Sequence, residues 1–192
     1  MRHIGIYGGS FNPIHNGHVA IARAMLHLAA LDEVWLVVSP HNPLKPSGTL
    51  LDDNKRLLMA RTAVNGIDGI KVSDCEFHLP RPSYMWNTLQ HLSETHSDCE
   101  FTLLIGADNW EVFNRWYRAD DIIANYRIAI YPRSGSPVDT ANLPSGVQLY
   151  NTGLYDISST QVRQRIADGL DISPLVPASI ACLATQFYSC QP

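Results

Sequence analysis

Short apolar runs alternate with longer mixed stretches along the chain. The runs at residues 34–38 and 101–105 are apolar almost throughout, which is typical of strands covered on both faces in a parallel sheet. Along the whole chain, this pattern predicts six strands, at residues 3–7, 33–39, 70–73, 101–106, 127–131 and 147–150. Segments with the length and composition of helices lie between them, at residues 19–30, 53–64, 84–95 and 120–124.

The alternation of strands and helices predicts the fold class. A strand, a helix and a further parallel strand connect through a right-handed crossover, so repetition of this unit builds a doubly wound, mainly parallel α/β sheet. The pattern leaves the strand order open. Proline-containing loops are predicted at residues 40–48 and 132–146, and a small helical portion is expected near the C-terminus. We expect residues 1–192 to form one domain.

Composition narrows the choice of partners and compartment. The 192 residues are 45% hydrophobic and 17% charged, with a net charge of -4. Such a balance indicates a globular protein without a nucleic-acid-binding surface. No apolar run is long enough to cross a bilayer and the first residues lack the pattern of a signal peptide, so we expect no membrane partner. The four cysteines form no CxxC pair and are interpreted as reduced thiols of a cytoplasmic protein.

The most informative segment is the turn after the first predicted strand, GGSFNPIHNGH at residues 8–18. In an open α/β sheet, ligands bind beyond the carboxyl ends of the strands, which is where this turn lies. Gly8 and Gly9 carry no Cβ, so their backbone amides can approach a phosphate closely. Gly17 and the following helix start add further amides, and His15 and His18 can donate to phosphate oxygens.

Two other interpretations of this turn stay open. A pair of glycines after a strand is often only a tight turn, and two histidines three residues apart can form a metal pair. Metal sites need further ligands, however, and the segment contains neither cysteine nor carboxylate. It also matches neither the GxGxxG fingerprint of dinucleotide-binding proteins nor a P-loop. A phosphate site is the interpretation that we favour.

A second segment, DISSTQVR at residues 156–163, has the pattern of a helix start. Ser158 followed by Gln161 fits a capping box. The hydroxyls of Ser159 and Thr160 and the guanidinium of Arg163 are then expected to converge on one anion, because residues four apart share a helix face. An ordinary capped surface helix with a solvated arginine is the alternative.

Together the two segments resemble the nucleotidyltransferase superfamily with the HxGH signature. Residues 8–18 are similar to its GGxFDPxHxGH motif, with Asn12 where Asp is more common, and residues 157–163 are similar to its ISSTxxR motif. The resemblance implies a Rossmann-like fold and catalytic roles for His15, His18 and Arg163. It also implies an ATP site with Mg²⁺ held mainly by the phosphates, and with these binding residues: Gly8, Gly9, Ser10, Phe11, Gly17, His18, Gly106, Asp108, Arg133, Ser158, Ser159, Thr160 and Arg163.

The middle of the chain carries candidates for the second substrate. Lys45 follows the second predicted strand and either meets a phosphate or is an exposed loop lysine. Asp108 follows the fourth strand and either binds a ribose hydroxyl or magnesium-bound water, or caps the next helix. The aromatic residues Phe113, Trp116 and Tyr117 are either core residues or a platform for a cationic pyridinium ring.

These middle segments resemble the bacterial nicotinate-nucleotide adenylyltransferase family. The resemblance implies transfer of AMP from ATP to nicotinate mononucleotide, with Trp116 stacked on the nicotinate ring and backbone amides near Met85 and Tyr117 receiving its carboxylate. Met85 stands where the family has Thr, so the choice between the acid and the amide substrate stays open. The implied substrate-binding residues are Lys45, Ser83, Tyr84, Met85, Asp108, Trp116 and Tyr117.

Three alternative functions are weighed against this interpretation. Phosphopantetheine adenylyltransferases share both phosphate motifs, but they fit the Trp116–Tyr117 pair and the longer middle segment less well. An adenylyltransferase that prefers nicotinamide mononucleotide is the second alternative. The third is a regulatory module that binds a nucleotide without turnover. Such a module would need only the glycine turn, so the presence of both histidines together with Ser159, Thr160 and Arg163 counts against it. The oligomeric state stays open, a homo-oligomer included.

Overall fold

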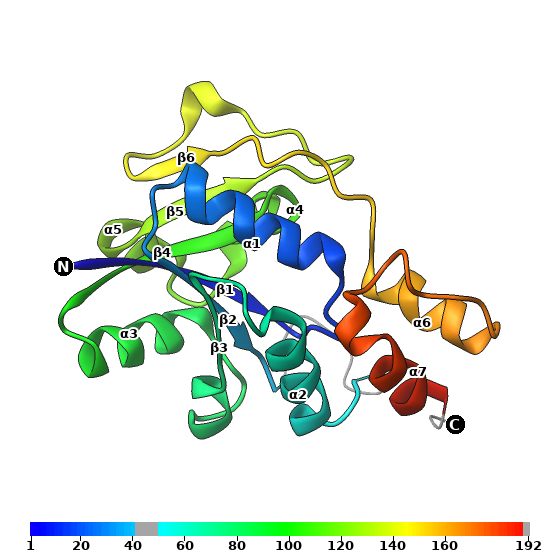
Figure 1. Cartoon of the computed structure of the whole chain (residues 1–192). Helices are drawn as coiled ribbons and strands as arrows, with labels where there is room; N and C mark the ends of the chain where they lie inside the picture. Colours follow the sequence, from blue (N-terminus) through cyan, green and yellow to red (C-terminus); the bar gives the residue numbers. More distant parts are fainter. Residues whose placement is uncertain (41–49, 190–192) are drawn as a thin grey trace.

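A single parallel sheet forms the centre of the computed structural model, which describes residues 1–40 and 50–189 (Figure 1). Its strand order is β3-β2-β1-β4-β5-β6. The strands are β1 (Arg2–Gly9), β2 (Glu33–Val38), β3 (Ile70–Ser73), β4 (Cys99–Gly106), β5 (Arg127–Tyr131) and β6 (Val147–Leu149). The sequence predicted all six of these strands and the doubly wound fold class, both of which are confirmed, whereas the order could not be predicted.

Seven α-helices are described around this sheet. They are α1 (Asn16–Leu28), α2 (Asp53–Val64), α3 (Met85–Thr95), α4 (Ala107–Glu111), α5 (Ala119–Asn125), α6 (Ser159–Ala167) and α7 (Ala181–Ser189). Short 3₁₀ segments are η2 (Cys75–His78), η3 (Phe113–Arg115), η4 (Thr140–Asn142) and η5 (Ala178–Ile180). The expected C-terminal helical portion is present as α6 and α7, which pack against each other beyond the carboxyl ends of the strands (Figure 1).

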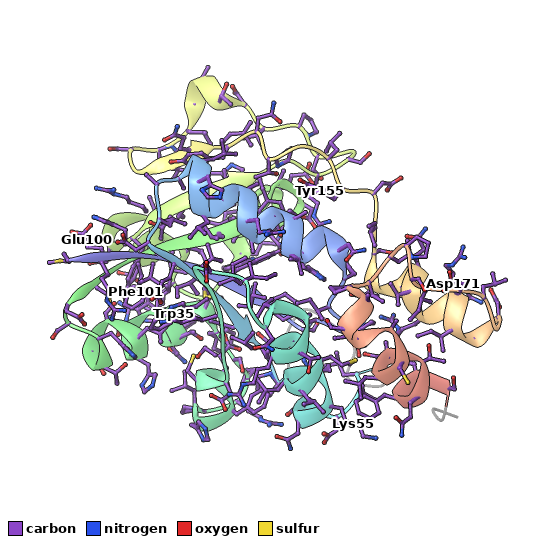
Figure 2. The ribbon with its side chains drawn as sticks, viewed as in Figure 1. Trp35, Lys55, Glu100, Phe101, Tyr155 and Asp171 are labelled. Carbon is purple, nitrogen blue, oxygen red and sulfur yellow. The ribbon has the colours of Figure 1, made fainter. Side chains whose placement is uncertain are left out.

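The two faces of the sheet are buried in two separate hydrophobic clusters. Side chains fill the space between the sheet and the surrounding helices (Figure 2). Leu36 and Leu104 point to the face covered by α1 and α2, whereas Val37 and Leu103 point to the face covered by α3 and α5. Successive strand residues therefore both face apolar layers, because side chains alternate along a strand. This double burial explains the unbroken apolar runs in the sequence.

The sheet contains a topological switch point between β1 and β4. These strands lie side by side at the centre of the sheet, and the chain winds outward from them in opposite directions, through β2 and β3 on one side and β5 and β6 on the other. A crevice opens where the connections diverge at the carboxyl ends of such strands, and ligands of open α/β sheets bind there. Gly9 and Gly106, which end the two strands, border this crevice.

Helix boundaries are where the sequence and the structure differ most. The helix predicted from residue 19 begins at Asn16, because His15 occupies the N-cap and forms a capping box with His18. Sequence rules expect Ser, Thr, Asp or Asn at that position. The alternative role of Asp108 as a helix cap is wrong, since Gly106 is the N-cap of α4 and Asp108 lies within its first turn. Ser158 caps α6 as predicted, accepting from the N–H of Gln161 at 3.1 Å.

Arg56 of α2 lies fully buried beneath the first turn. Its guanidinium donates to the carbonyl oxygens of Leu51 and Ser39, each at 2.9 Å, and to that of Ser10. A further 2.6 Å bond joins it to the Asp53 carboxylate. One buried cation therefore connects the turn after β1 with the end of β2 and the start of α2.

Replacement of Arg56 by Met should destabilise the fold strongly. The change leaves buried carbonyls without their donor and removes one of the two arginines that pair with Asp53, a loss of about 3–5 kcal/mol in the free energy of unfolding measured by urea denaturation. Arg61→Met is the matched control, because Arg61 is half exposed and pairs with Asp74 at the surface, where such pairs contribute less than about 1 kcal/mol. Equal losses for the two variants would contradict the anchoring role of Arg56.

Candidate active site

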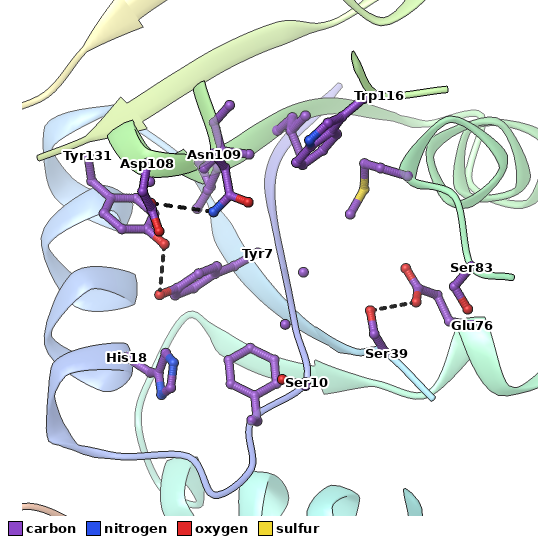
Figure 3. Close-up of a pocket in the computed structure, with 18 of the residues that line it drawn as sticks. Tyr7, Ser10, His18, Ser39, Glu76, Ser83, Asp108, Asn109, Trp116 and Tyr131 are labelled. Atoms are coloured by element: carbon purple, nitrogen blue, oxygen red, sulfur yellow. Dashed lines mark hydrogen bonds between the residues drawn. The ribbon is translucent and has the colours of Figure 1, made fainter. Parts of the chain in front are cut away.

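A cavity of about 500 Å³ occupies the switch point (Figure 3). The ends of β1 and β4 form its floor, and the segment before α3 and the segment after η3 form its walls. Of the predicted site residues it contains Gly8, Gly9, Ser10, Phe11, His18, Ser83, Tyr84, Met85, Gly106, Asp108, Trp116, Tyr117, Arg133 and Ser159. Residues from widely separated parts of the chain thus share one hollow, as the sequence predicted.

A second cavity of about 310 Å³ adjoins the first. Ser10, His18, Arg133 and Ser159 line both cavities. The smaller cavity also contains four further predicted phosphate-binding groups, namely His15, Ser158, Thr160 and Arg163, whereas Gly17 lines neither cavity. The early turn and the late helix start therefore face each other across one continuous space.

Direct hydrogen bonds join these two segments. The Ser159 hydroxyl donates to the carbonyl oxygen of Pro13 at 2.8 Å, and Arg163 Nη1 donates to that of Asn12 at 2.7 Å. Arg163 Nη2 donates to the Thr160 hydroxyl at 3.1 Å. Part of the donor capacity at the start of α6 is therefore used to hold the turn after β1. Other polar groups at the start of α6 line the smaller cavity.

The two histidines form a stacked pair, with ring centroids 3.6 Å apart. His15 Nδ1 accepts from the backbone N–H of His18 at 3.4 Å, and His18 Nδ1 accepts from that of His15 at 3.2 Å. Because each Nδ1 acts as an acceptor, a neutral ring carries its proton on Nε2. Gly17 lies between them without a side chain, and a Cβ there would be 3.1 Å from His15 Nδ1. The capping bonds thus fix both the position and the tautomer of the pair.

The surroundings of His15 keep its imidazole neutral. Its side chain is 3% exposed, and burial, followed by the charge of Arg133, lowers its pKa from 6.5 to about 3. A neutral Nε2–H still donates a hydrogen bond. A role for His15 as an imidazolium is therefore disfavoured.

Glycines at the strand ends leave room for neighbouring site residues. A Cβ on Gly8 would lie 2.6 Å from Met85 Cε, and one on Gly9 would lie 3.0 Å from the Phe11 ring. At Gly106, a Cβ would collide with the carboxylate of Asp108. A side chain at any of these positions would force its neighbours to shift, so glycine leaves room for them and keeps the backbone accessible from the cavity.

Three side chains in the wall of the larger cavity each carry a buried nitrogen or oxygen atom that has no hydrogen-bond partner. Within the described ranges, these are Ser83 Oγ, Trp116 Nε1 and Arg133 Nε, and they are the whole set. Arg133 Nε lies 3.7 Å from Asp108 Oδ1, beyond hydrogen-bond range. Buried polar groups are normally satisfied, so their concentration around one cavity points to a polar ligand.

The aromatic residues separate into core and cavity. Phe113 is 2% exposed and belongs to the core, whereas Trp116 packs on it at 5.1 Å and also lines the cavity. Tyr84 and Tyr117 lie ring against ring at 4.8 Å beside them. The core interpretation is confirmed for Phe113, whereas the platform for a pyridinium ring stays a prediction for Trp116 and Tyr117, which line the cavity. Lys45 lies outside the described residues.

Sequence reasoning missed a buried carboxyl on the opposite wall. Glu76, in η2 after β3, is 1% exposed and accepts from the Ser39 and Thr88 hydroxyls at 2.7 and 2.8 Å (Figure 3). Burial raises the pKa of this carboxyl, although neighbouring hydroxyls, those of Ser39 and Thr88 among them, act to lower it. Its position at the carboxyl edge of the sheet was the available signal. It links β2, η2 and α3 around the cavity.

The metal interpretation of the histidine pair gains no support. Among residues 1–40 and 50–189, no group of three or more His, Cys, Asp or Glu side chains is placed to hold a metal ion.

In the same part of the chain, every helix is too short or too polar to traverse a lipid bilayer.

Comparisons with known proteins agree with the geometry. Residues 6–165 match the family model described as cytidylyltransferase-like. A Bacteroides fragilis protein named "Probable nicotinate-nucleotide adenylyltransferase" is 46% identical over 168 residues, 88% of this chain and 84% of that protein. A Flavobacterium johnsoniae protein of the same name is 42% identical over 92% of this chain and 93% of its own.

Solved structures show the same fold. The Plasmodium falciparum nicotinic acid mononucleotide adenylyltransferase superimposes with a TM-score of 0.82 at 20% identity, covering 100% of this chain and 99% of that one. Fold and sequence matches together define a nucleotidyltransferase with a Rossmann-like sheet. Within this class, the chain belongs to the cytidylyltransferase-like family and, more narrowly, to the nicotinate-nucleotide adenylyltransferases.

The low pKa of His15 predicts a pH-dependent stability. Unfolded His15 takes up a proton below pH 6.5 while the folded residue stays neutral down to about pH 3, so acidification favours the unfolded state. Relative to His15→Asn, which keeps a cap without a titrating ring, the wild type should lose about 1.4 kcal/mol per pH unit below 6.5. Urea denaturation of both proteins at pH 7 and pH 5 measures this, and a constant difference between them would refute it.

Proposed function

We propose that this protein transfers AMP from ATP to nicotinate mononucleotide, forming nicotinate adenine dinucleotide and pyrophosphate. The observation that carries the proposal is the pair of joined cavities, which share Ser10, His18, Arg133 and Ser159. The smaller cavity is lined by hydroxyls, histidines and Arg163, a set suited to a triphosphate. The larger cavity has an aromatic wall suited to a pyridine ring. The names of the relatives support the same reaction, as do the Plasmodium structures complexed with NaAD and with APC.

The chemical step is an in-line displacement at phosphorus. A phosphate oxygen of the mononucleotide attacks the α-phosphorus of ATP, a new P–O bond forms, and the bond to the bridging oxygen breaks as pyrophosphate leaves with the electron pair. The attacking phosphate is largely ionised near neutral pH, since its second pKa is about 6. The reaction therefore needs no protein nucleophile. Its catalysis depends on alignment and on stabilisation of the leaving charge.

The histidine pair suits this stabilisation. The Nδ1 atoms are occupied by the helix cap, so each ring can present its Nε2–H to the α- and β-phosphates, and His15 does so as a neutral donor. A neutral donor fixed by capping needs no reorganisation when charge develops. Ser10, Thr160 and Arg163, together with the amides at the start of α6, are assigned to the β- and γ-phosphates.

Asp108 is the residue best placed to meet a magnesium ion. Its side chain is half exposed at the cavity, and Mg²⁺ is commonly bound through one or two carboxylates together with substrate phosphates. When bound, the ion would shield the phosphate oxygens.

The acceptor is assigned to the larger cavity. Trp116 would stack on the pyridinium ring, which an indole face attracts, and amides near Tyr117 and Met85 would receive its carboxylate. The Met85 side chain reaches across the cavity to Gly8 and supplies a thioether where the family has a hydroxyl. Recognition of the acid form thus depends on backbone groups. The proposal takes residues 1–192 as one domain that acts on ATP and this mononucleotide.

A panel of acceptors tests the proposed reaction. The protein is incubated with ATP and Mg²⁺ and, separately, with nicotinate mononucleotide, nicotinamide mononucleotide or phosphopantetheine, and pyrophosphate release is measured. We expect the highest kcat/KM with nicotinate mononucleotide. A preference for either other acceptor would replace the assignment, and ATP binding without pyrophosphate from any acceptor would instead support a regulatory module.

Two alanine variants should separate chemistry from acceptor binding. His18→Ala removes a donor to the reacting phosphates and should lower kcat by about a hundredfold or more. Trp116→Ala removes the stacking surface and should raise KM for the mononucleotide by about tenfold with a smaller change in kcat. His27→Ala, at the exposed end of the same helix as His18, is the control and should leave both constants unchanged. Near-normal kcat in His18→Ala would show that its assigned role is wrong.

A further inference from the structure

The turn between β1 and α1 is held mainly by residues from elsewhere in the chain. Residues 10–15 belong to neither a strand nor a helix. Their neighbours on α6 and α2 donate to the turn's carbonyl groups, and the backbone N–H of Asn16 donates to Leu175 at 2.8 Å. The Asn16 side chain donates to Pro174 at 3.1 Å. The C-terminal portion of the chain therefore contacts the turn along most of its length.

Asn12 is the centre of this contact. Its side chain is 4% exposed, and its Oδ1 accepts two bonds, from the N–H of Leu51 at 3.1 Å and from the Tyr188 hydroxyl at 2.6 Å. Its backbone oxygen accepts from Arg163. A single residue thus ties α6 and α7 to the turn, one through its backbone and the other through its side chain.

Tyr188 provides the bond from the last helix. Its side chain is 8% exposed, and the residue before it, Phe187, packs under the ammonium of Lys55 on α2. Tyr188 lines neither cavity. Burial raises the pKa of its phenol above the usual value, with the charges of Arg163 and Arg56 acting in the opposite direction. The hydroxyl is therefore a permanent donor to Asn12 and not a group that touches a substrate.

We propose that Tyr188 is a positioning residue for the triphosphate: through Asn12 it fixes the carbonyl that holds Arg163 at the smaller cavity. Without the hydroxyl, Oδ1 loses one of its hydrogen bonds, and the Asn12 side chain is held less firmly. The backbone oxygen of Asn12, on which Arg163 is oriented, then loses its fixed position. This inference rests on the proposed function, since it assumes that the smaller cavity receives ATP.

The variant Tyr188→Phe tests the proposal, because it should alter KM for one substrate and not for the other. We expect KM for ATP to rise about five- to tenfold, the equivalent of one lost hydrogen bond, while KM for nicotinate mononucleotide stays within twofold. Tyr126→Phe is the matched control, because the Tyr126 hydroxyl also bonds a partner side chain, Ser93, at 3.1 Å but lies away from both cavities. Both variants should lower Tm by a few degrees, but the control should change neither KM.

A double-mutant cycle identifies the route through Asn12. Asn12→Ala should raise KM for ATP at least as much as Tyr188→Phe, and the double variant should show no further increase, because both changes break the same contact. Additive increases would overturn the proposed route. An unchanged KM for ATP in Tyr188→Phe, with only Tm lowered, would assign Tyr188 a purely structural role.

Failure of the inference is distinguishable from failure of the proposed function. If the wild type releases no pyrophosphate with any acceptor, the function is wrong, yet the ATP dissociation constants of wild type and Tyr188→Phe still test the positioning role by calorimetry. If the wild type is active and both variants bind ATP equally, the function stands and the inference falls.

Discussion

The clasp between two distant segments is the interaction on which the site depends. Arg163 and Ser159 at the start of α6 donate to the carbonyls of Asn12 and Pro13 in the turn after β1. A turn of this kind has few bonds within itself, and unpaired backbone groups are costly when buried. The donors that stabilise the turn thus come from the helix that borders the same cavity. Fold stability and site geometry are consequences of the same hydrogen bonds.

The histidine pair likewise has both a structural role and a role in the proposed catalysis. Mutual capping places His15 and His18 at the beginning of α1 and fixes Nδ1 as the acceptor in both rings. Burial keeps His15 neutral by lowering its pKa. Charge stabilisation in the proposed reaction then comes from oriented dipoles and from arginines, rather than from a titrating imidazolium at residue 15. Such preorganised groups are effective where charge develops during a reaction.

Much of this architecture could be predicted from the sequence, because periodicity and turn composition report directly on local structure. Both segments that border the smaller cavity were identified from residue types and spacing. The start of α1 was misplaced, since a histidine at the N-cap departs from the usual capping preferences. Short helices such as α4 and α7 carry too few turns to produce a clear periodic signal.

The remaining features depend on contacts that are remote in sequence. Residue type does not distinguish Arg56 from a surface arginine, and the position of Glu76 after a strand does not by itself show that it is buried, yet the structure buries both. The same holds for Tyr188, whose partner is Asn12, 176 residues away. The order of the strands likewise follows from packing between distant runs. Tertiary burial, not residue type, gives these groups their roles.

Hydrogen exchange on addition of a non-hydrolysable ATP analogue with Mg²⁺ tests the central claim most directly. If one triphosphate is bound between the two segments, amides at residues 8–18 and at residues 158–163 should become protected together, at the same analogue concentration. Protection of only one segment, while the analogue is bound, would contradict the account.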